Sequence, residues 1–338
     1  MRRTFLRPGY PSVTGDSWSE HMLRLLMAYD SSQNCLGVSV SLFHDASHGA
    51  VFRAARLNRW LMRILAVPVG IDATNWRIRH TQYHHSYANI EHLDLDIEAN
   101  FALRQSPFQP WRSHYRYQHL YWPTVAALSL PYLNWYADWC DRFGKTALTN
   151  DAELAGWRAP TVFLVSKLLH VSFVLLLPLW CWQDVGIGWS MVLGWYLLGQ
   201  MSASCVLVLL ILGTHWADRD FFLPPDDAVL SHSWHAHQFR TTCDWTPWPS
   251  WVSALLGGLN YHLTHHLYPS YSHRHYADLS REVALFAQRR GIAYRRLGYC
   301  ELARLQLLFL RRMGQPSTPH YRSHAQYLHD RDRWHGKE

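Results

Sequence analysis

Cysteine and lysine are both scarce in this chain of 338 residues. The six cysteines are scattered without a CxxC pair, which argues against a disulfide framework and against zinc-ribbon and iron–sulfur sites, whose ligands are mainly thiolates. Only three lysines accompany 29 arginines, and the net charge of +7 favours an anionic membrane surface or an acidic protein as partner, with no nucleic acid expected. No apolar stretch precedes Pro11, so a signal peptide is not predicted.

Histidine, in contrast, is abundant, with 23 residues. Eight of them form three short clusters in which the spacing is three, four or five residues. Positions three or four apart share one face of an α-helix, so each cluster can aim several ring nitrogens at one point. Eight imidazoles exceed the four ligands of a structural zinc, which favours two metal ions. Chance could produce one such cluster but hardly three. The clusters are His44-Asp-Ala-Ser-His48, His80-Thr-Gln-Tyr-His84-His85 and His262-Leu-Thr-His265-His266.

Two apolar segments are long enough to cross a bilayer. Residues 161–182 contain one formal charge, Lys167, and residues 190–212 contain none. At 1.5 Å per residue each helix would reach roughly 33 Å, the thickness of a hydrocarbon core. The short link 183–189 allows only a tight turn, so we expect a transmembrane hairpin over residues 161–212. The alternative is a pair of core helices in a soluble protein.

Aromatic and basic residues predict the orientation of this hairpin. Tryptophans gather at its turn, as in an interfacial belt, and basic residues flank its two open ends, which places those ends in the cytoplasm. All three histidine clusters then lie on the cytoplasmic face. A further apolar stretch, residues 120–139, is expected to lie on the membrane surface, because a single crossing there would separate the clusters. The tryptophans are Trp180, Trp182, Trp189 and Trp195, and the basic residues are Arg142, Lys145, Arg158, Arg219 and Arg240.

Other histidines differ in their expected roles. His215 follows the second apolar segment closely, where its ring could reach a metal just outside the bilayer, so it is a candidate ninth ligand. His170 lies near the middle of the first segment and is expected to be a packing residue hydrogen-bonded to a neighbouring helix. A third group falls in an expected loop and is interpreted as surface residues, namely His232, His235 and His237.

The order HxxxH, HxxxHH, HxxHH resembles that of the membrane fatty acid desaturase family, and in particular its linoleoyl-CoA desaturase-like branch. The likeness extends beyond the clusters and covers roughly residues 42–294. It includes the approach to the second cluster (residues 75–80), the segment after it (89–97), the segment 103–121, the run His237-Gln-Phe-Arg-Thr-Thr-Cys-Asp244, and the residues 257–276 around the third cluster.

This resemblance implies an all-α integral membrane protein in which a transmembrane hairpin carries a cytoplasmic helical cap with a dinuclear metal site. It implies two irons, replaceable by zinc on overexpression, with O2 as co-substrate and a fatty acyl chain as substrate. We expect one domain over residues 1–338, with a reduced N-terminal region (1–43), the hairpin (161–212) and a polar tail (316–338). The metal ligands implied are His44, His48, His80, His84, His85, His215, His262, His265 and His266.

Carboxylates and amides near these histidines could orient the rings from behind. Asp45 and Asn260 are the principal candidates, and Asp94 and Asp96 are further ones that helix solvation explains equally well.

No fused cytochrome b5 domain with a His-Pro-Gly-Gly motif is recognisable, so electrons are expected from a separate ferredoxin or cytochrome b5-type protein. A basic surface could receive this donor, or an acyl carrier protein, or could contact anionic lipid instead. It comprises Arg281, Arg289, Arg290, Arg295 and Arg296.

Three alternatives remain open at this point. The third cluster begins with His262, a form shared with hydroxylases, and the N-terminal region is short, so an acyl hydroxylase or an acetylenase of the same superfamily is possible. A membrane metal-binding or transport protein would also gather histidines, but it should carry ligands inside its spans.

Overall fold

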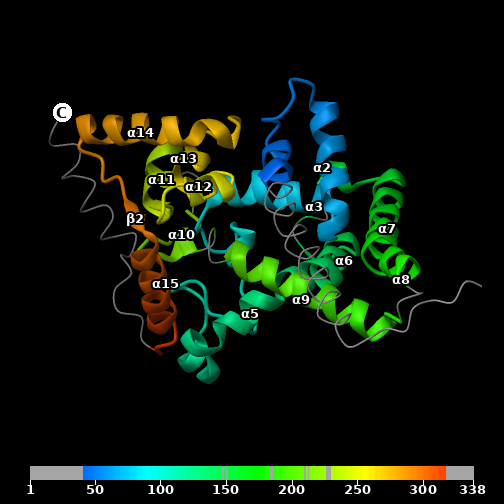
Figure 1. Cartoon of the computed structure of the whole chain (residues 1–338). Helices are drawn as coiled ribbons and strands as arrows, with labels where there is room; N and C mark the ends of the chain where they lie inside the picture. Colours follow the sequence, from blue (N-terminus) through cyan, green and yellow to red (C-terminus); the bar gives the residue numbers. More distant parts are fainter. Residues whose placement is uncertain are drawn as a thin grey trace, which may run out of the picture.

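The computed structural model describes residues 41–146, 148, 151–182, 186–208, 211, 213–225 and 230–316. Residues 1–40 of the expected N-terminal region and residues 317–338 of the expected tail lie outside this part. The described chain is mostly helical, as predicted (Figure 1). An unpredicted addition is one short parallel pair, in which β1 (Asp244–Thr246) bonds to β2 (Arg296–Gly298).

The helices follow one another along the chain, with η marking 3-10 or π-helical turns. Residues 41–47 are helical. They are followed by α2 (Ala55–Val69), α3 (Ala73–Arg77), η1 (Ile78–His84), α4 (His85–Tyr87), η2 (Leu95–Ile97), η3 (Ser113–Tyr117), α5 (Gln118–Tyr132), η4 (Leu133–Ala137), α6 (Asp138–Arg142), η6 (Ala152–Leu154), α7 (Arg158–Val171), η7 (Ser172–Leu176), α8 (Leu177–Cys181), α9 (Trp189–Leu207), α10 (Gly213–Trp216), α11 (Trp234–Thr241), α12 (Val252–Leu255), α13 (His262–Leu267), η10 (His273–His275), α14 (Tyr276–Arg290) and α15 (Tyr299–Met313).

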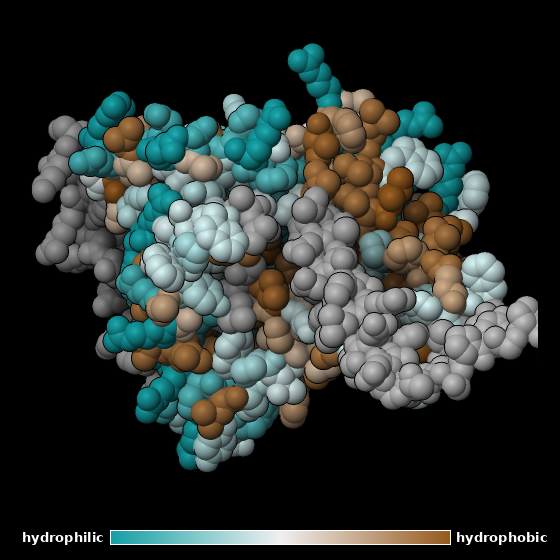
Figure 2. Space-filling model, viewed as in Figure 1, coloured by the Kyte–Doolittle hydropathy of each residue, from teal (hydrophilic) through white to brown (hydrophobic). Residues whose placement is uncertain are grey.

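Two helices in the described chain have the length and composition to cross a membrane. They are the continuous run α7–η7–α8, residues 158–181, and α9. Only 17% and 22% of their most apolar windows are buried inside the protein. Large apolar side chains such as Leu168 (67% exposed) and Phe173 (51% exposed) point outwards. Figure 2 shows hydrophobic surface gathered over α2, α7 and α8. A core helix of a soluble protein is mostly buried, so this exposure favours the hairpin prediction over the soluble alternative.

The stretch expected at the membrane surface forms one continuous helix, α5–η4–α6, that lies along α9. Ser204 of α9 is inserted into its backbone ladder, where the hydroxyl donates to the Ala126 carbonyl and accepts from the Leu130 amide, just before Pro131. A side chain inserted in this way replaces the regular bond between residues four apart. At one end of the helix Gln118 bonds to Arg104 and Leu310, and at the other end Asp141 bonds to Arg79 in the histidine-bearing η1.

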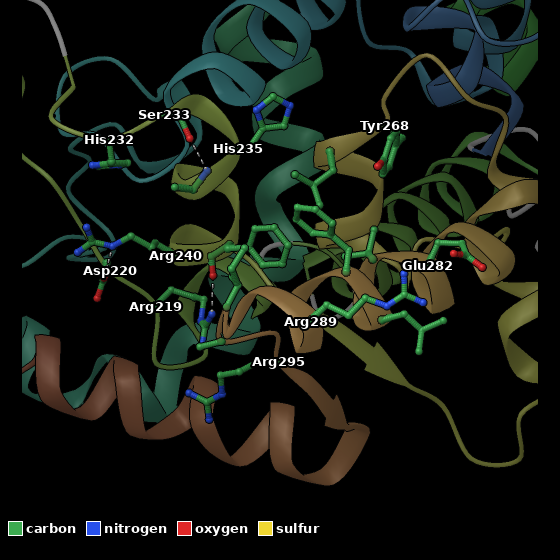
Figure 3. Close-up of a pocket in the computed structure, with 18 of the residues that line it drawn as sticks. Arg219, Asp220, His232, Ser233, His235, Arg240, Tyr268, Glu282, Arg289 and Arg295 are labelled. Atoms are coloured by element: carbon green, nitrogen blue, oxygen red, sulfur yellow. Dashed lines mark hydrogen bonds and ion pairs between the residues drawn. The ribbon is translucent and has the colours of Figure 1, made fainter. Parts of the chain in front are cut away.

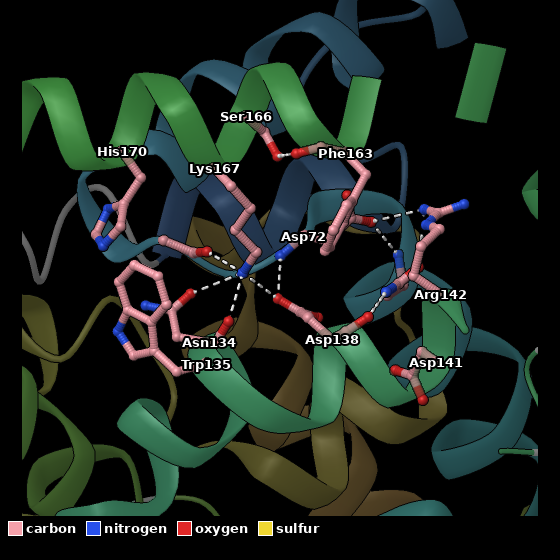
Figure 4. Close-up of polar contacts among 12 residues, drawn as sticks. Asp72, Asn134, Trp135, Asp138, Asp141, Arg142, Phe163, Ser166, Lys167 and His170 are labelled. Carbon is pink, nitrogen blue, oxygen red and sulfur yellow. Dashed lines mark hydrogen bonds and ion pairs between the residues drawn. The ribbon is translucent and has the colours of Figure 1, made fainter. Parts of the chain in front are cut away.

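The C-terminal end of α2 is held by polar side chains from three other helical segments. The last carbonyls of a helix have no partner within it. Here the Val67 carbonyl accepts from His170, the Val69 carbonyl from Asn134 and Gln200, and the Gly70 carbonyl from Lys167. The Lys167 ammonium also donates to Asp138 at 2.7 Å (Figure 4). The apolar helices are thereby locked to the segment that joins the first two histidine clusters.

Gly70 permits this close packing. Its φ of 94° is left-handed, and a Cβ at this position would lie 2.3 Å from the Asn134 side-chain nitrogen and 2.6 Å from the His170 ring. Both the backbone conformation and the available space therefore require glycine at this turn.

Candidate metal centre

The nine histidines predicted as ligands fall into two groups in the structure. Within each group the ligand nitrogens lie within 4.8 Å of one another. One group contains five residues, His44, His48, His80, His85 and His265, and the other contains four, His84, His215, His262 and His266. All nine are buried or nearly buried, and they come from segments up to about two hundred residues apart in the chain.

The second cluster does not follow the α-helical geometry expected from its spacing. Residues 78–84 form a π-helical turn, and the amide of His85 bonds to the carbonyl of His80, five residues earlier. His80 and His85 therefore share a face and join the five-histidine group, while His84 turns towards the other group. The prediction that His80 and His84 converge on one point was wrong, because the hydrogen bond of a π turn joins residues five apart instead of four apart.

The third cluster is also divided between the groups. In α13, His262 and His266 are four residues apart and share the four-histidine group, whereas His265 joins the five-histidine group. The second and third clusters thus each contribute histidines to both groups. The two potential metal positions therefore share the same supporting helices.

The inward nitrogens of several of these rings face one another at short distance. The Nε2 atoms of His85 and His265 are 2.9 Å apart, those of His44 and His80 are 3.0 Å apart, and those of His215 and His262 are 2.9 Å apart. Among the described residues, the Nε2 atoms of His48 and His266 are buried and have no hydrogen-bond partner. Unpartnered buried nitrogens are costly. A set of converging imidazole donors fits iron or zinc, and a cation would satisfy all of them.

Four of the rings are oriented from behind through Nδ1. The Nδ1 atom of His215 donates to the Thr241 carbonyl at 3.0 Å. Because the proton of the neutral ring is then on Nδ1, the Nε2 atom keeps its lone pair for a metal. His84 contacts Asp94 at 3.1 Å, His265 contacts the Tyr276 hydroxyl at 2.8 Å, and His266 contacts the Gln238 side-chain oxygen at 2.8 Å. Such outer contacts fix the tautomer and direction of metal-ligating histidines.

Gln238 and Tyr276 were missed as orienting residues. Gln238 is fully buried in α11, and its amide nitrogen also donates to the His85 carbonyl at 3.3 Å, so it contacts one residue from each histidine group. Both residues lie in segments that resemble the family, but their spacing from the clusters gave no signal.

Asp45 and Asn260, the two principal candidates for orienting the rings, make their hydrogen bonds to residues other than the nine grouped histidines. Asp45 accepts from the backbone and ring of His273, and its other oxygen is 4.0 Å from the Nδ1 of His44. Asn260 instead bonds to the Trp245 carbonyl and accepts from Ser253. The Trp245 amide in turn donates to the backbone carbonyl of Asn260. These bonds hold β1 against the segment before α13. The side-chain amide of Asn260 therefore stabilises the local structure and does not orient a histidine ring.

The remaining histidines separate into packing and surface residues. His170 donates to the Val67 carbonyl at 2.7 Å and contacts the Tyr196 hydroxyl at 3.0 Å, which confirms its predicted packing role. His235 is exposed, as predicted, although it lies in α11 and not in a loop. His237 was wrongly assigned to a surface loop, because it lies fully buried in α11, where it bonds to the Ala88 carbonyl and to His232.

Burial keeps most of the clustered imidazoles neutral. It lowers the pKa of His44 to about 4 and lowers the pKa of the other grouped histidines, except His84, well below 6.5. Burial also acts against charge on His84, but Asp94 and Asp96 more than offset it and raise the pKa of His84 to about 9. Neutral imidazole is the form that binds metal. The carboxylates beside His84 add negative charge to the four-histidine group.

A cavity of about 1250 Å³ lies between α11, α14 and the chain after α10 (Figure 3). Arg289 and Arg295, two residues of the predicted basic surface, line it together with Arg219 and Arg240. Arg240 and Arg295 pair with Asp220 and Asp218, each at 2.7 Å. None of the nine grouped histidines lines this cavity, although α11 carries Gln238 towards them on its other side.

Comparison with known proteins gives a consistent result. Residues 23–298 match the family described as fatty acid desaturase. An sn-1 linoleoyl-lipid 6-desaturase of Synechocystis sp. is 30% identical over 268 residues, covering 76% of this chain and 71% of that protein. An enzyme of the same name from Arthrospira platensis is 26% identical over 76% of this chain and 68% of its own length. An acyl-lipid (8-3)-desaturase of Physcomitrium patens is 28% identical over 71% of this chain, but the match spans only 49% of that protein. The chain therefore belongs to the fatty acid desaturase family and is an oxidoreductase that desaturates acyl chains.

Proposed function

We propose that the nine grouped histidines bind two iron ions, and that the chain introduces a cis double bond into a lipid-linked fatty acyl chain with O2 as oxidant. The division of nine converging imidazoles into sets of five and four carries this proposal. Iron would supply the oxidising power, because an unactivated methylene has no acidity that a side-chain base could exploit. One O2, two electrons, two protons and two substrate hydrogens give the alkene and two waters.

The protein's own residues would position and isolate this centre. Asp94, Tyr276, Gln238 and the Thr241 carbonyl hold four rings in the orientation that a metal requires. Burial keeps most of the other imidazoles neutral and therefore ready to bind. Zinc would also suit such a donor set and could replace iron on overexpression.

The lipid-linked substrate is supported by the relatives, whose names specify linoleoyl-lipid or acyl-lipid desaturation. We place the whole chain in one membrane domain, with α7–η7–α8 and α9 as a transmembrane hairpin and α5–α6 at the interface. The basic residues at the open end of the hairpin support a cytoplasmic location for the histidine groups.

Electrons would come from a separate acidic carrier protein of the ferredoxin or cytochrome b5 type. The arginine-rich cavity between α11 and α14 supports this assignment, because complementary charge steers association. The α11 helix borders this cavity and, through Gln238, also contacts His266 and the His85 carbonyl.

A metal transporter does not fit the apolar helices. Such a protein should carry ligands near the middle of its spans. After Arg158 at the start of α7, the only charged residue in the described parts of α7–η7–α8 and α9 is Lys167, which is bound to Asp138. His170 is bound to a carbonyl and a tyrosine.

The function is tested by adding a deuterated acyl lipid, reductant and labelled O2 to the reconstituted protein. We expect loss of two hydrogens from the acyl chain, no labelled oxygen in the product, and close to two irons per chain in metal analysis. Label retained as a hydroxyl would identify a hydroxylase, and loss of four hydrogens an acetylenase. A single tightly held ion would contradict the dinuclear centre.

A further inference from the structure

Helix α2 carries three distinct stripes along its length. Its buried stripe contains Asn58, Met62, Ala66 and Val69 and faces the protein. Next to it, three arginines recur at the spacing of a helix face, namely Arg56, Arg59 and Arg63. Beyond these lies an exposed apolar stripe of Leu57 (51% exposed), Trp60 (54%) and Ile64 (62%).

The arginines of α2 have no partner among the described residues. Arg56 and Arg59 are exposed, Arg63 is half-buried, and no salt bridge or side-chain hydrogen bond within the described chain uses any of the three. Elsewhere in the described chain some exposed or partly exposed arginines, such as Arg240 and Arg295, are paired with carboxylates, whereas others, such as Arg304, have no carboxylate partner among the described residues. Three positive charges in one row, with no partner among the described residues, form a surface that an anionic partner could bind.

The position of α2 against α7 fixes the depth of these charges. The Val67 carbonyl bonds to His170, which lies roughly 18 Å along α7 from Arg158 at 1.5 Å per residue. In Figure 1, α2 and the run from α7 to α8 both descend, and the loop before α2 is uppermost. Arg63, Arg59 and Arg56 then lie roughly 6, 12 and 16 Å above Val67. Along α2, Arg63 is thus the deepest of the three arginines and Arg56 lies nearest to the proposed cytoplasmic side.

The apolar stripe of α2 is part of the same surface as the candidate spans. The hydrophobic area in Figure 2 extends over α2, α7 and α8. If lipid covers α7, it must also reach Ile64 and Trp60. An acidic protein would satisfy the arginines but would leave this apolar stripe to be covered separately, whereas a lipid leaflet offers phosphate groups and acyl chains at adjacent depths.

We infer that α2 is a re-entrant interfacial helix whose arginines bind the headgroups of acidic phospholipids on the histidine side of the membrane. This inference rests on the proposed membrane placement. The apolar stripe enters the acyl region, and the flexible stem of Arg63 allows its charged end to reach up to the phosphates.

The experiment measures lipid selectivity and needs neither metal nor turnover. Wild-type protein is reconstituted in phosphatidylcholine vesicles containing spin-labelled phosphatidylglycerol or spin-labelled phosphatidylcholine, and the immobilised lipid fraction is compared by electron spin resonance. Each arginine at an acidic surface strengthens such contacts by roughly fivefold. We expect a clear preference of wild type for phosphatidylglycerol that weakens with salt, and loss of most of it in Arg56→Gln/Arg59→Gln/Arg63→Gln.

The matched control removes the same charge from α14, in Arg281→Gln/Arg289→Gln/Arg290→Gln, and should keep the preference. All three of these arginines are exposed. Equal losses in the two triple variants, or no loss in the α2 variant, would overturn the inference, and the latter result would point to an acidic protein as the partner of α2. If the α2 triple variant does not fold, the wild-type measurement still tests the inference. Wild-type protein that shows no preference for phosphatidylglycerol, or a preference that salt does not weaken, would also overturn the inference. Failure of the protein to resist extraction from vesicles by alkali would instead contradict the membrane placement.

Discussion

At the scale of single residues, the two histidines nearest the apolar helices have opposite roles although their sequence contexts are similar. His215 faces His262 with its Nε2 atom and is held from behind by Thr241. Both nitrogens of His170 are occupied by protein groups away from either histidine group. Of these two histidines, only His215 therefore has a ring nitrogen directed at a histidine group and available for a metal.

We predict that His215→Ala abolishes desaturation and lowers the metal content while the protein remains in the membrane. His170→Ala should retain both metals and substantial activity, with a loss of stability of about 1–3 kcal/mol from the unsatisfied Val67 carbonyl. Metal analysis and product analysis of the two purified variants make the comparison. Similar, mild effects from both substitutions would return His215 to a structural role.

Asp94 and Asp96 provide a second matched pair. The Asp94 carboxylate is buried 3.1 Å from the His84 ring, while the Asp96 side chain is 41% exposed and 3.4 Å away. Removing an outer carboxylate typically weakens metal binding about 10–100-fold. We expect Asp94→Asn to lose metal from the four-histidine group during dialysis against a chelator, and Asp96→Asn to lose much less. Asp94 also caps η2, where its side chain accepts a hydrogen bond from the Asp96 amide at 3.0 Å. Equal retention in both variants would show that this cap is its only role.

At the scale of secondary-structure elements, one lysine joins three segments (Figure 4). Lys167 of α7 donates to the Gly70 carbonyl after α2, to the Asn134 carbonyl in η4 and to Asp138 in α6, each at 2.7 Å. Both members of the ion pair are buried. Removing one member of a buried pair leaves an uncompensated charge, which is far more costly than removing both.

Lys167→Met should therefore lower the free energy of unfolding by about 3–5 kcal/mol. The double variant Lys167→Met/Asp138→Asn should recover part of this loss, because the asparagine can still accept from the Asp72 amide. Denaturant unfolding in detergent, followed by tryptophan fluorescence, measures both. If the double variant were the less stable of the two, the ion pair would not be the source of the effect.

At the scale of the whole molecule, the convergence of all three histidine clusters restricts the membrane topology. An engineered cysteine at residue 187, between the two candidate spans, should react with a membrane-impermeant reagent from outside the cell. Cysteines placed beside His44, His80 or His266 should react only after the membrane is permeabilised. Labelling of any of these three positions in intact cells would show that the histidine groups face the outside of the cell, which would contradict the proposed topology.

The buried imidazoles also predict how the metal-free protein responds to pH. Folding lowers the pKa of His44 and His232 to about 4 and that of His237 to about 3, from 6.5. The unfolded chain then binds more protons below pH 6.5, so stability falls as the pH decreases from 6.5 towards 4. His84 has the opposite sign, because its raised pKa gives a stabilisation that is lost as the pH rises through about 9. Unfolding temperatures in detergent should peak between these limits, and a constant value on acidification would contradict this account.

The sequence by itself determined which residues could form the metal centre and which helices could enter a membrane. Three histidine clusters and two long apolar runs are local patterns, and local spacing is enough to recognise them. His215 also followed from its distance along the chain to the second apolar run. The packing role of His170 followed from its depth in the first one.

The tertiary structure alone decided how these residues are divided and oriented. A π-helical turn sends His84 to one group and His80 and His85 to the other, although the HxxxHH pattern favours a different pairing. Gln238 and Tyr276 reach His266 and His265 from other helices, at separations that no local spacing encodes. Asn260 lies close to the third cluster in sequence, but its hydrogen bonds go to β1 and Ser253. The physical reason is that hydrogen-bond partners are chosen by packing in three dimensions, whereas a sequence pattern specifies only which face of its own helix a residue occupies.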